Sequence, residues 1–135
     1  MAGDLAETFL MVSDIEESVS FYTDVIGLEL TKWDGDARFD TGGATLVLEE
    51  DFDEEVLAGF GLEPPGESRG DGVIVVLEVD DPDEIAARAA DHDYEVVSEP
   101  RDVDWGRRMC LLADPDGYML EVSKPLEGDS LDGDN

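Results

Sequence analysis

Basic residues are scarce in this chain, and cysteine and histidine are nearly absent. Lysine and arginine together number 8, against 37 aspartates and glutamates, and lysine occurs only as Lys32 and Lys124. Without a basic patch to neutralise phosphates, no nucleic-acid partner is expected. The single cysteine, Cys110, rules out an internal disulfide. Because it lies in an apolar strand, it is expected to be a buried core thiol rather than a nucleophile.

Long apolar runs are also missing. No run approaches membrane-spanning length, and the N-terminus lacks a basic region followed by an apolar one. We therefore expect a cytoplasmic protein with no membrane partner. The length of 135 residues allows one domain with a real core, but not two independent domains.

The acidic excess gives a formal net charge of -29. Such self-repulsion destabilises a compact domain unless salt screens it. The acids are scattered through every segment, and this pattern resembles that of proteins from salt-accumulating halophiles. An acidic decoy for a basic partner is the competing interpretation, and the even scattering favours the halophilic one.

An internal repeat organises the chain. In its first copy, Asp14 suits a helix N-cap and Gly27 a helix stop. Strands are predicted at Glu7–Ser13, at Leu28–Trp33 and in a hairpin that turns at Asp40–Gly43 and ends with Ala44–Glu49. In the second copy, Asp81 suits an N-cap, and Pro82 follows at the favoured first helical position.

The second copy ends in a hairpin. Asp114-Pro115-Asp116-Gly117 is typical of a type I turn between two strand-length apolar arms. The other strands of this copy are predicted at Val73–Val79 and Tyr94–Val97. The order predicts an α+β fold of two βαβββ units.

The expected boundaries follow from this order. Residues 1–125 are predicted to form a single domain, with module one at 5–50, a linker at 51–71 and module two at 72–125. One helical turn is expected in the linker around Glu54–Phe60. Residues 126–135 are expected to form an acidic mobile tail.

The motifs of both copies resemble a known family. The resemblance is carried by Val12-Ser13-Asp14, Ser18, Phe21-Tyr22, Gly27-Leu28, Leu77–Asp81, Asp114–Gly117 and Leu120-Glu121. This ordered set resembles the vicinal oxygen chelate superfamily, which includes glyoxalase I, extradiol dioxygenases and bleomycin-resistance proteins. The resemblance implies paired βαβββ modules that form a curled mixed sheet around a cleft, commonly in a homodimer. It does not imply a reaction, since one fold serves many chemistries.

The resemblance also implies positions for metal ligands. They fall on Glu7, near Glu49, on Ile74 and on Glu121, which would also be the catalytic residue. Ile74 cannot coordinate a metal, and the only histidine, His92, is expected in a surface loop. We therefore expect no cofactor, although an all-oxygen site of Glu7, Glu49 and Glu121 could hold Mn²⁺ or Mg²⁺.

A small-molecule ligand is the expected partner. Large aromatics near a cleft often line pockets, and an inward arginine could pair with Glu121 or bind an anion. Packing at an interface and neutralising surface acids are the competing roles. The residues predicted to bind ligand are Phe9, Met11, Trp33, Trp105, Arg108 and Met119.

Two functions remain open at this point. One is a binding protein with a degenerate metal site, similar to bleomycin-resistance proteins. The other is a metal-dependent glyoxalase-like lyase or dioxygenase that uses an oxygen-rich site.

Overall fold

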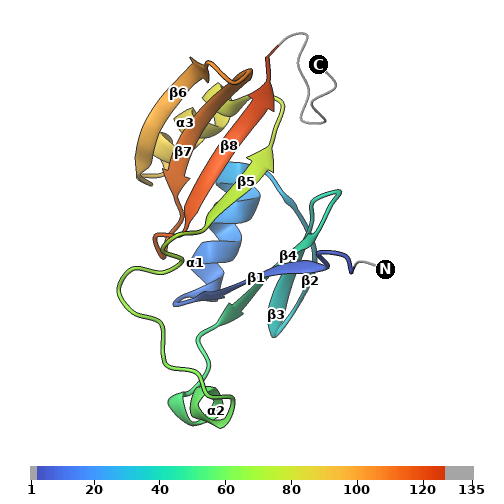
Figure 1. Cartoon of the computed structure of the whole chain (residues 1–135), viewed down its shortest axis with the longest axis vertical. Helices are drawn as coiled ribbons and strands as arrows, with labels where there is room; N and C mark the ends of the chain where they lie inside the picture. The colour runs from blue at the N-terminus through green and yellow to red at the C-terminus, as the bar shows by residue number, and fades with distance from the viewer. Residues whose placement is uncertain (1–2, 127–135) are drawn as a thin grey trace. The chain divides into compact units, whose positions relative to one another are not determined.

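The chain divides into two units, the first ending at Glu67 and the second beginning at Ser68. The structure is a computed structural model, and it describes residues 3–126. Each unit holds its own four-stranded mixed sheet (Figure 1). The predicted α+β fold of paired βαβββ units is therefore confirmed.

The first unit follows the predicted order. Its elements are β1 (Glu7–Val12), α1 (Ile15–Ser20), the π-helix η1 (Phe21–Ile26), β2 (Glu29–Asp34), β3 (Asp36–Asp40), β4 (Thr45–Glu50) and the linker helix α2 (Glu54–Gly59). The sheet order is β1-β4-β3-β2, in which β1 runs parallel to β4 and the other pairs are antiparallel.

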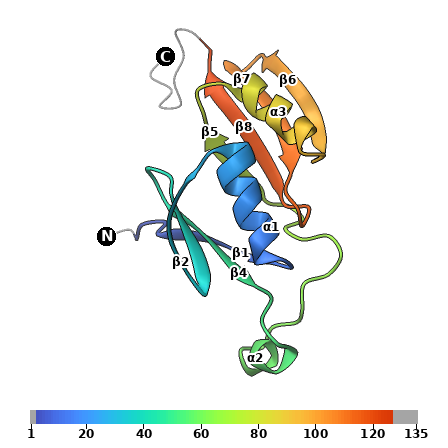
Figure 2. The same cartoon turned by 180° about the vertical axis from the view of Figure 1, so that it is seen from behind.

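The second unit repeats this arrangement. Its elements are β5 (Ile74–Glu78), α3 (Pro82–Asp91), β6 (Val96–Val103), β7 (Arg107–Ala113) and β8 (Met119–Pro125). Its sheet order, β5-β8-β7-β6, has the same sequence of parallel and antiparallel pairs. Figure 2 shows α3 lying across this sheet. The internal repeat predicted from the sequence is thus a repeat of topology.

The predicted caps form as expected. The side chain of Asp14 accepts the backbone N–H groups of Glu16 and Glu17 at 3.1 and 3.2 Å. Asp81 accepts the N–H of Glu84 at 3.2 Å, and Pro82 begins α3. Gly27 ends the first helix with a φ of 92°. The π-helical last turns were not predicted.

The turn at 114–117 is closed by its first aspartate. Gly117 donates its N–H to the Asp114 carbonyl at 2.9 Å. The Asp114 carboxylate accepts the N–H groups of Asp116 and Tyr118, each at 2.9 Å. This turn sets the register of β7 against β8, so that Leu112 pairs with Leu120.

One face of each sheet is packed under a helix. In the first unit, the buried ring of Tyr22 lies 6.0 Å from that of Phe39. In the second unit, α3 packs on β6, β7 and β8, and the Cys110 thiol lies 3.9 Å from the Pro82 carbonyl. Burial raises the pKa of Cys110 to about 11. The prediction of a buried core thiol is confirmed.

The structure does not test the predictions about the acidic tail and the module boundaries. Apart from Leu126, the predicted acidic tail lies outside the described residues. The predicted module boundaries remain predictions, although α2 forms where a helical turn was expected. Within residues 3–126, no helix is long and apolar enough to cross a membrane.

Candidate functional site

The open face of the first sheet carries several of the predicted site residues. Alternation along β1 places Glu7, Phe9 and Met11 on the face opposite the buried Leu10 and Val12. Met11 is paired in register with Glu49 of β4, so these two side chains are neighbours. The Phe9 side chain is 45% exposed, and its ring lies 6.2 Å from that of Phe52.

Glu7 is part of an ion-pair network on this face. Its Oε2 accepts a hydrogen bond from Nη1 of Arg38 at 2.8 Å, and Nε of Arg38 donates to Asp36 at 2.9 Å. The two carboxylates raise the pKa of Arg38, mainly through the hydrogen bond to Glu7. The Glu7 carboxylate is therefore already held by a cation.

The open face of the second sheet carries the other predicted positions. Ile74 pairs with Met119 and Val76 pairs with Glu121 across β5 and β8. The intervening Leu120 is fully buried on the opposite face, as is Val122. Glu121 thus has the strand parity expected from the sequence, on the face turned away from α3.

A pocket of about 350 Å³ lies at one end of this face. The segment before β5, the start of β5 and the start of β8 form its walls. Its lining residues are Arg69, Gly70, Asp71, Gly72, Val73, Ile74, Gly117 and Met119. A volume of this size is at the lower end for small-molecule sites. The pocket brings together two positions predicted from the sequence, Ile74 and Met119.

The wall before β5 is anchored to Tyr118. The guanidinium of Arg69 lies 3.9 Å from Oδ1 of Asp116, and its side chain is only 13% exposed. Burial raises the pKa of Tyr118, while the charge of Arg69 and a hydrogen bond with it act in the opposite direction. Gly70 packs directly on the Tyr118 ring. These contacts give the pocket a preformed wall.

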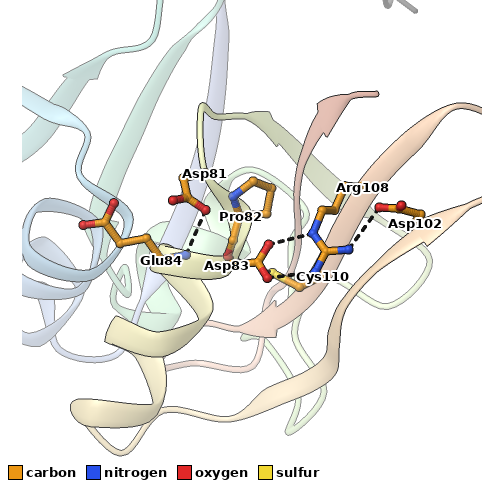
Figure 3. Close-up of polar contacts among 7 residues, drawn as sticks. All are labelled: Asp81, Pro82, Asp83, Glu84, Asp102, Arg108 and Cys110. Carbon is orange, nitrogen blue, oxygen red and sulfur yellow. Dashed lines mark hydrogen bonds and ion pairs between the residues drawn. The ribbon is translucent and has the colours of Figure 1, made fainter. Parts of the chain in front are cut away.

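The two adjacent arginines of β7 lie on opposite faces. Arg108, the predicted ligand-binding arginine, lies on the α3 side (Figure 3). Its Nε and Nη2 donate to the two carboxylate oxygens of Asp83 at 2.7 and 2.8 Å, and its Nη1 donates to Asp102 at 3.0 Å. The hydrogen bond from Arg108 lowers the pKa of Asp83. Arg108 thus neutralises two acids.

Arg107 is the arginine on the face of Glu121. It is buried, and its Nη2 donates to Ser123 at 3.0 Å and lies 3.7 Å from Glu78. Its Nη1 is buried without a hydrogen-bond partner in the described part of the chain. The sequence prediction named Arg108 as the ligand-binding arginine, whereas the arginine that lies on the face of Glu121 is Arg107.

Neither tryptophan lines the pocket. Trp33 lies on the edge strand β2 and is 46% exposed, while Trp105 lies in the turn before β7 and is 66% exposed. A register shift between Leu30 and Lys32 pairs Trp33 with Ala37, a buried residue of the packed face. The role of both tryptophans in ligand binding remains a prediction.

The residues at the implied metal positions do not fit a metal ion. The Ile74 side chain has no donor atom, and the Glu7 carboxylate is engaged by Arg38. No three side chains of His, Cys, Asp or Glu gather as a possible metal site within residues 3–126. His92 is exposed at the end of α3, with Nδ1 2.8 Å from the Arg88 carbonyl.

Arg69 is the pocket residue that the sequence did not single out. It falls in the predicted linker, between acids and glycines that indicated only a loop. The sequence did contain one signal for this position. Arg69 is one of only eight basic residues in the chain, and it is followed closely by Gly70 and Gly72.

Comparisons with known proteins agree with this architecture. The sequence profile of the Glyoxalase/Bleomycin resistance protein/Dioxygenase superfamily matches residues 4–122. A protein of Mycobacterium bovis named as a glyoxylase is 31% identical over 123 residues. That match covers 91% of this chain but 44% of the relative, so the chain spans less than half of that protein's length.

A lactoylglutathione lyase of Salmonella typhimurium is 28% identical over 122 residues, which cover 87% of this chain and 90% of the lyase. Among solved structures, a glyoxalase/bleomycin resistance protein/dioxygenase from Nocardioides has a TM-score of 0.69 at 26% identity. That alignment covers 97% of this chain and 89% of the other. The chain belongs to the Glyoxalase/Bleomycin resistance protein/Dioxygenase superfamily.

Proposed function

We propose that this chain binds a small molecule in the pocket at the start of β5 and does so without a metal ion. The observation that carries the proposal is Ile74, which is 54% exposed and lines the pocket at a position implied to hold a metal ligand. An alkyl side chain there offers apolar contact area instead of a coordination bond.

The surroundings of Ile74 support binding rather than chemistry. Met119 pairs with Ile74 in register and lines the same pocket, so this part of the lining is apolar. Glu121, the predicted catalytic residue, lies two positions farther along β8 and is not among the pocket-lining residues. Among the described residues, the pocket lining therefore offers shape, apolar surface, one cation (Arg69) and one carboxylate (Asp71).

Nuclear magnetic resonance with a fragment library tests this function. Fragments comprising small acids, amines and neutral aromatics are added to ¹⁵N-labelled protein in molar KCl with a chelator. Hits should shift the amide signals of residues 69–74 and 117–119. Filling the pocket by Ile74→Trp should abolish those shifts, whereas Val56→Trp, at an exposed site on α2, should leave them unchanged. Hits that perturb only other regions, or no hits, would overturn the proposal.

A lyase is the second candidate, because several relatives are named lactoylglutathione lyase at 28% identity. This candidate needs a metal held by the oxygen ligands Glu7, Glu49 and Glu121. Protein purified in molar KCl without chelator would then carry about one Mn²⁺ or Mg²⁺ per chain, and Glu121→Gln would remove it. Metal-free protein would count against the lyase.

We further infer that the chain works as a homodimer in the cytoplasm. Members of the superfamily are commonly dimeric, and the open faces expose Phe9, Ile74 and Val76. Sedimentation in 1 M KCl should give twice the 14.7 kDa of one chain. A single-chain mass at micromolar concentration would contradict the dimer.

A further inference from the structure

We propose that the ligand of this pocket is a small organic carboxylate whose anionic group is bound by Arg69 and whose apolar body lies on Ile74 and Met119. This inference rests on the proposed function and specifies its ligand class. Among the lining residues within the described range 3–126, Arg69 is the only base and Asp71 the only acid. A guanidinium presents its N–H donors in a planar fork that matches a carboxylate.

The positive charge of Arg69 indicates the ligand class because the rest of the chain is strongly acidic. With a formal net charge of -29, the protein repels anions and attracts cations over most of its surface. Binding an anion therefore requires a local positive group in a partly desolvated place. The Arg69 side chain, 13% exposed at the pocket wall, meets this requirement.

The position of Arg69 is fixed before any ligand arrives. Asp116 and Tyr118 hold its guanidinium from the side of the 114–117 turn. Nη1 of Arg69 lies 3.9 Å from Oδ1 of Asp116, an ion pair that orients the guanidinium. A ligand carboxylate at the pocket wall would add a further interaction to the guanidinium.

The loop that carries Arg69 is shaped to leave the pocket open. Gly70 and Gly72 have φ values of 71° and 84°, and Val73 donates its N–H to the Gly70 carbonyl at 2.9 Å. Gly117 faces the same space with a φ of 90°. Gly70 packs on the Tyr118 ring, whereas a Cβ at Gly72 or Gly117 would meet nothing within 4 Å, so these two positions leave room for a ligand.

The apolar part of the ligand follows from the apolar residues of the lining. The side chains of Val73 and Ile74 are 59% and 54% exposed, and Met119 adds a flexible thioether. Covering these side chains favours a branched or aromatic hydrocarbon body. The carboxylate and the hydrocarbon body together define a small monocarboxylic acid as the ligand class.

A matched set of probes tests the inference by titration of ¹⁵N-labelled protein. The probes are 4-methylpentanoate, its neutral amide, the amine 4-methylpentylammonium and the corresponding alkyl phosphate. The carboxylate should shift the amide signals of residues 69–74 and 117–119 with at least about tenfold higher affinity than the amide, since hydrogen bonds between charged groups are stronger than those to a neutral amide. The amine should bind weakest.

Variants assign the preference to Arg69. In Arg69→Gln, the carboxylate should bind no better than the amide, while Arg88→Gln on α3 should behave as wild type. Asp116→Asn, which removes a competing negative charge, should tighten carboxylate binding. This second variant tests the inference even if Arg69→Gln fails to fold.

Three outcomes would overturn the inference. They are equal affinity for amide and carboxylate, tighter binding of the phosphate, and an affinity that neither variant changes. Equal binding of amide and carboxylate in the pocket would leave the proposed function intact and remove only the ligand class. Absence of binding by all four probes would overturn the ligand class, while the fragment library separately decides whether the pocket binds anything.

Discussion

Gly70 lies so close to Tyr118 that a Cβ added at Gly70 would stand 2.8 Å from Cδ1 and 3.2 Å from Cε1 of the ring. Gly70 also has a φ of 71°, a conformation that other residues rarely adopt. This contact joins the segment before β5 to the start of β8 and so fixes the wall of the pocket.

Gly70→Ala should therefore destabilise the second unit and weaken ligand binding. The positive φ costs about 1–2 kcal/mol, and the collision with the ring adds about 1–3 kcal/mol of overpacking. Gly72→Ala is the matched control, because its φ is 84° and nothing lies within 4 Å of its Cβ. Chemical denaturation of both variants should show a larger loss for Gly70→Ala. Equal losses would mean that the Tyr118 contact contributes nothing.

The pairing of Arg108 with Asp83 should make the free energy of unfolding depend on pH. Arg108 lowers the pKa of Asp83 in the folded protein. The Asp83 carboxylate therefore binds a proton more readily in the unfolded chain than in the folded one. The stabilisation is present above the ordinary value of 3.8 and is lost as the pH falls through the folded pKa. Carbon NMR of the Asp83 carboxyl should show this pKa rising towards 3.8 in Arg108→Met. The same pKa in Arg88→Met should stay at its wild-type value.

The buried thiol of Cys110 should resist modification in the folded protein. With a pKa of about 11, roughly one thiol in a thousand is ionised at pH 8, and thiolate is the reactive form. The folded protein holds the Cys110 thiol proton more tightly than the unfolded chain does. The resulting contribution to the free energy of unfolding is present below pH 9 and is lost as the pH rises through 11. A thiol reagent at pH 8 should label Cys110 only after unfolding. Rapid labelling of folded protein would contradict its burial.

Salt should stabilise the fold strongly. At molar salt the Debye length is about 3 Å, so repulsion among the scattered acids is screened. Thermal unfolding midpoints should rise steeply between low and molar KCl. A midpoint that does not change over this range would remove the halophilic interpretation of the net charge of -29.

Local signals in the sequence were sufficient for the order of elements. Asp14 and Asp81 cap their helices through their own neighbouring amides, and Asp114 closes its turn in the same way. These interactions span two to four residues, so their partners can be found in the sequence itself. The parity of Glu121 followed from period-2 alternation across a strand without a bulge.

The parts that sequence could not predict depend on distant partners or on irregular backbone. The sequence prediction chose Arg108 as the ligand-binding arginine, but the Arg108 side chain binds Asp83 of α3, 25 residues earlier in the chain, a partner that alternation along β7 does not reveal. Trp33 lies just after the register shift between Leu30 and Lys32. Such a shift moves the side chains that follow it to the other face of the sheet. Arg69 contacts Asp116 and Tyr118, which lie nearly fifty residues farther along the chain.

Metal independence of ligand binding is the most direct test of the proposed function. The measurement is a calorimetric titration of the tightest-binding carboxylate into chelator-treated protein and into protein supplied with Mn²⁺, Ni²⁺ or Zn²⁺. Because Ile74 offers no coordinating atom in the pocket wall, the dissociation constants should agree within about twofold, a difference of about 0.4 kcal/mol. Binding that appears only with added metal, and is lost in Glu121→Gln, would contradict the account.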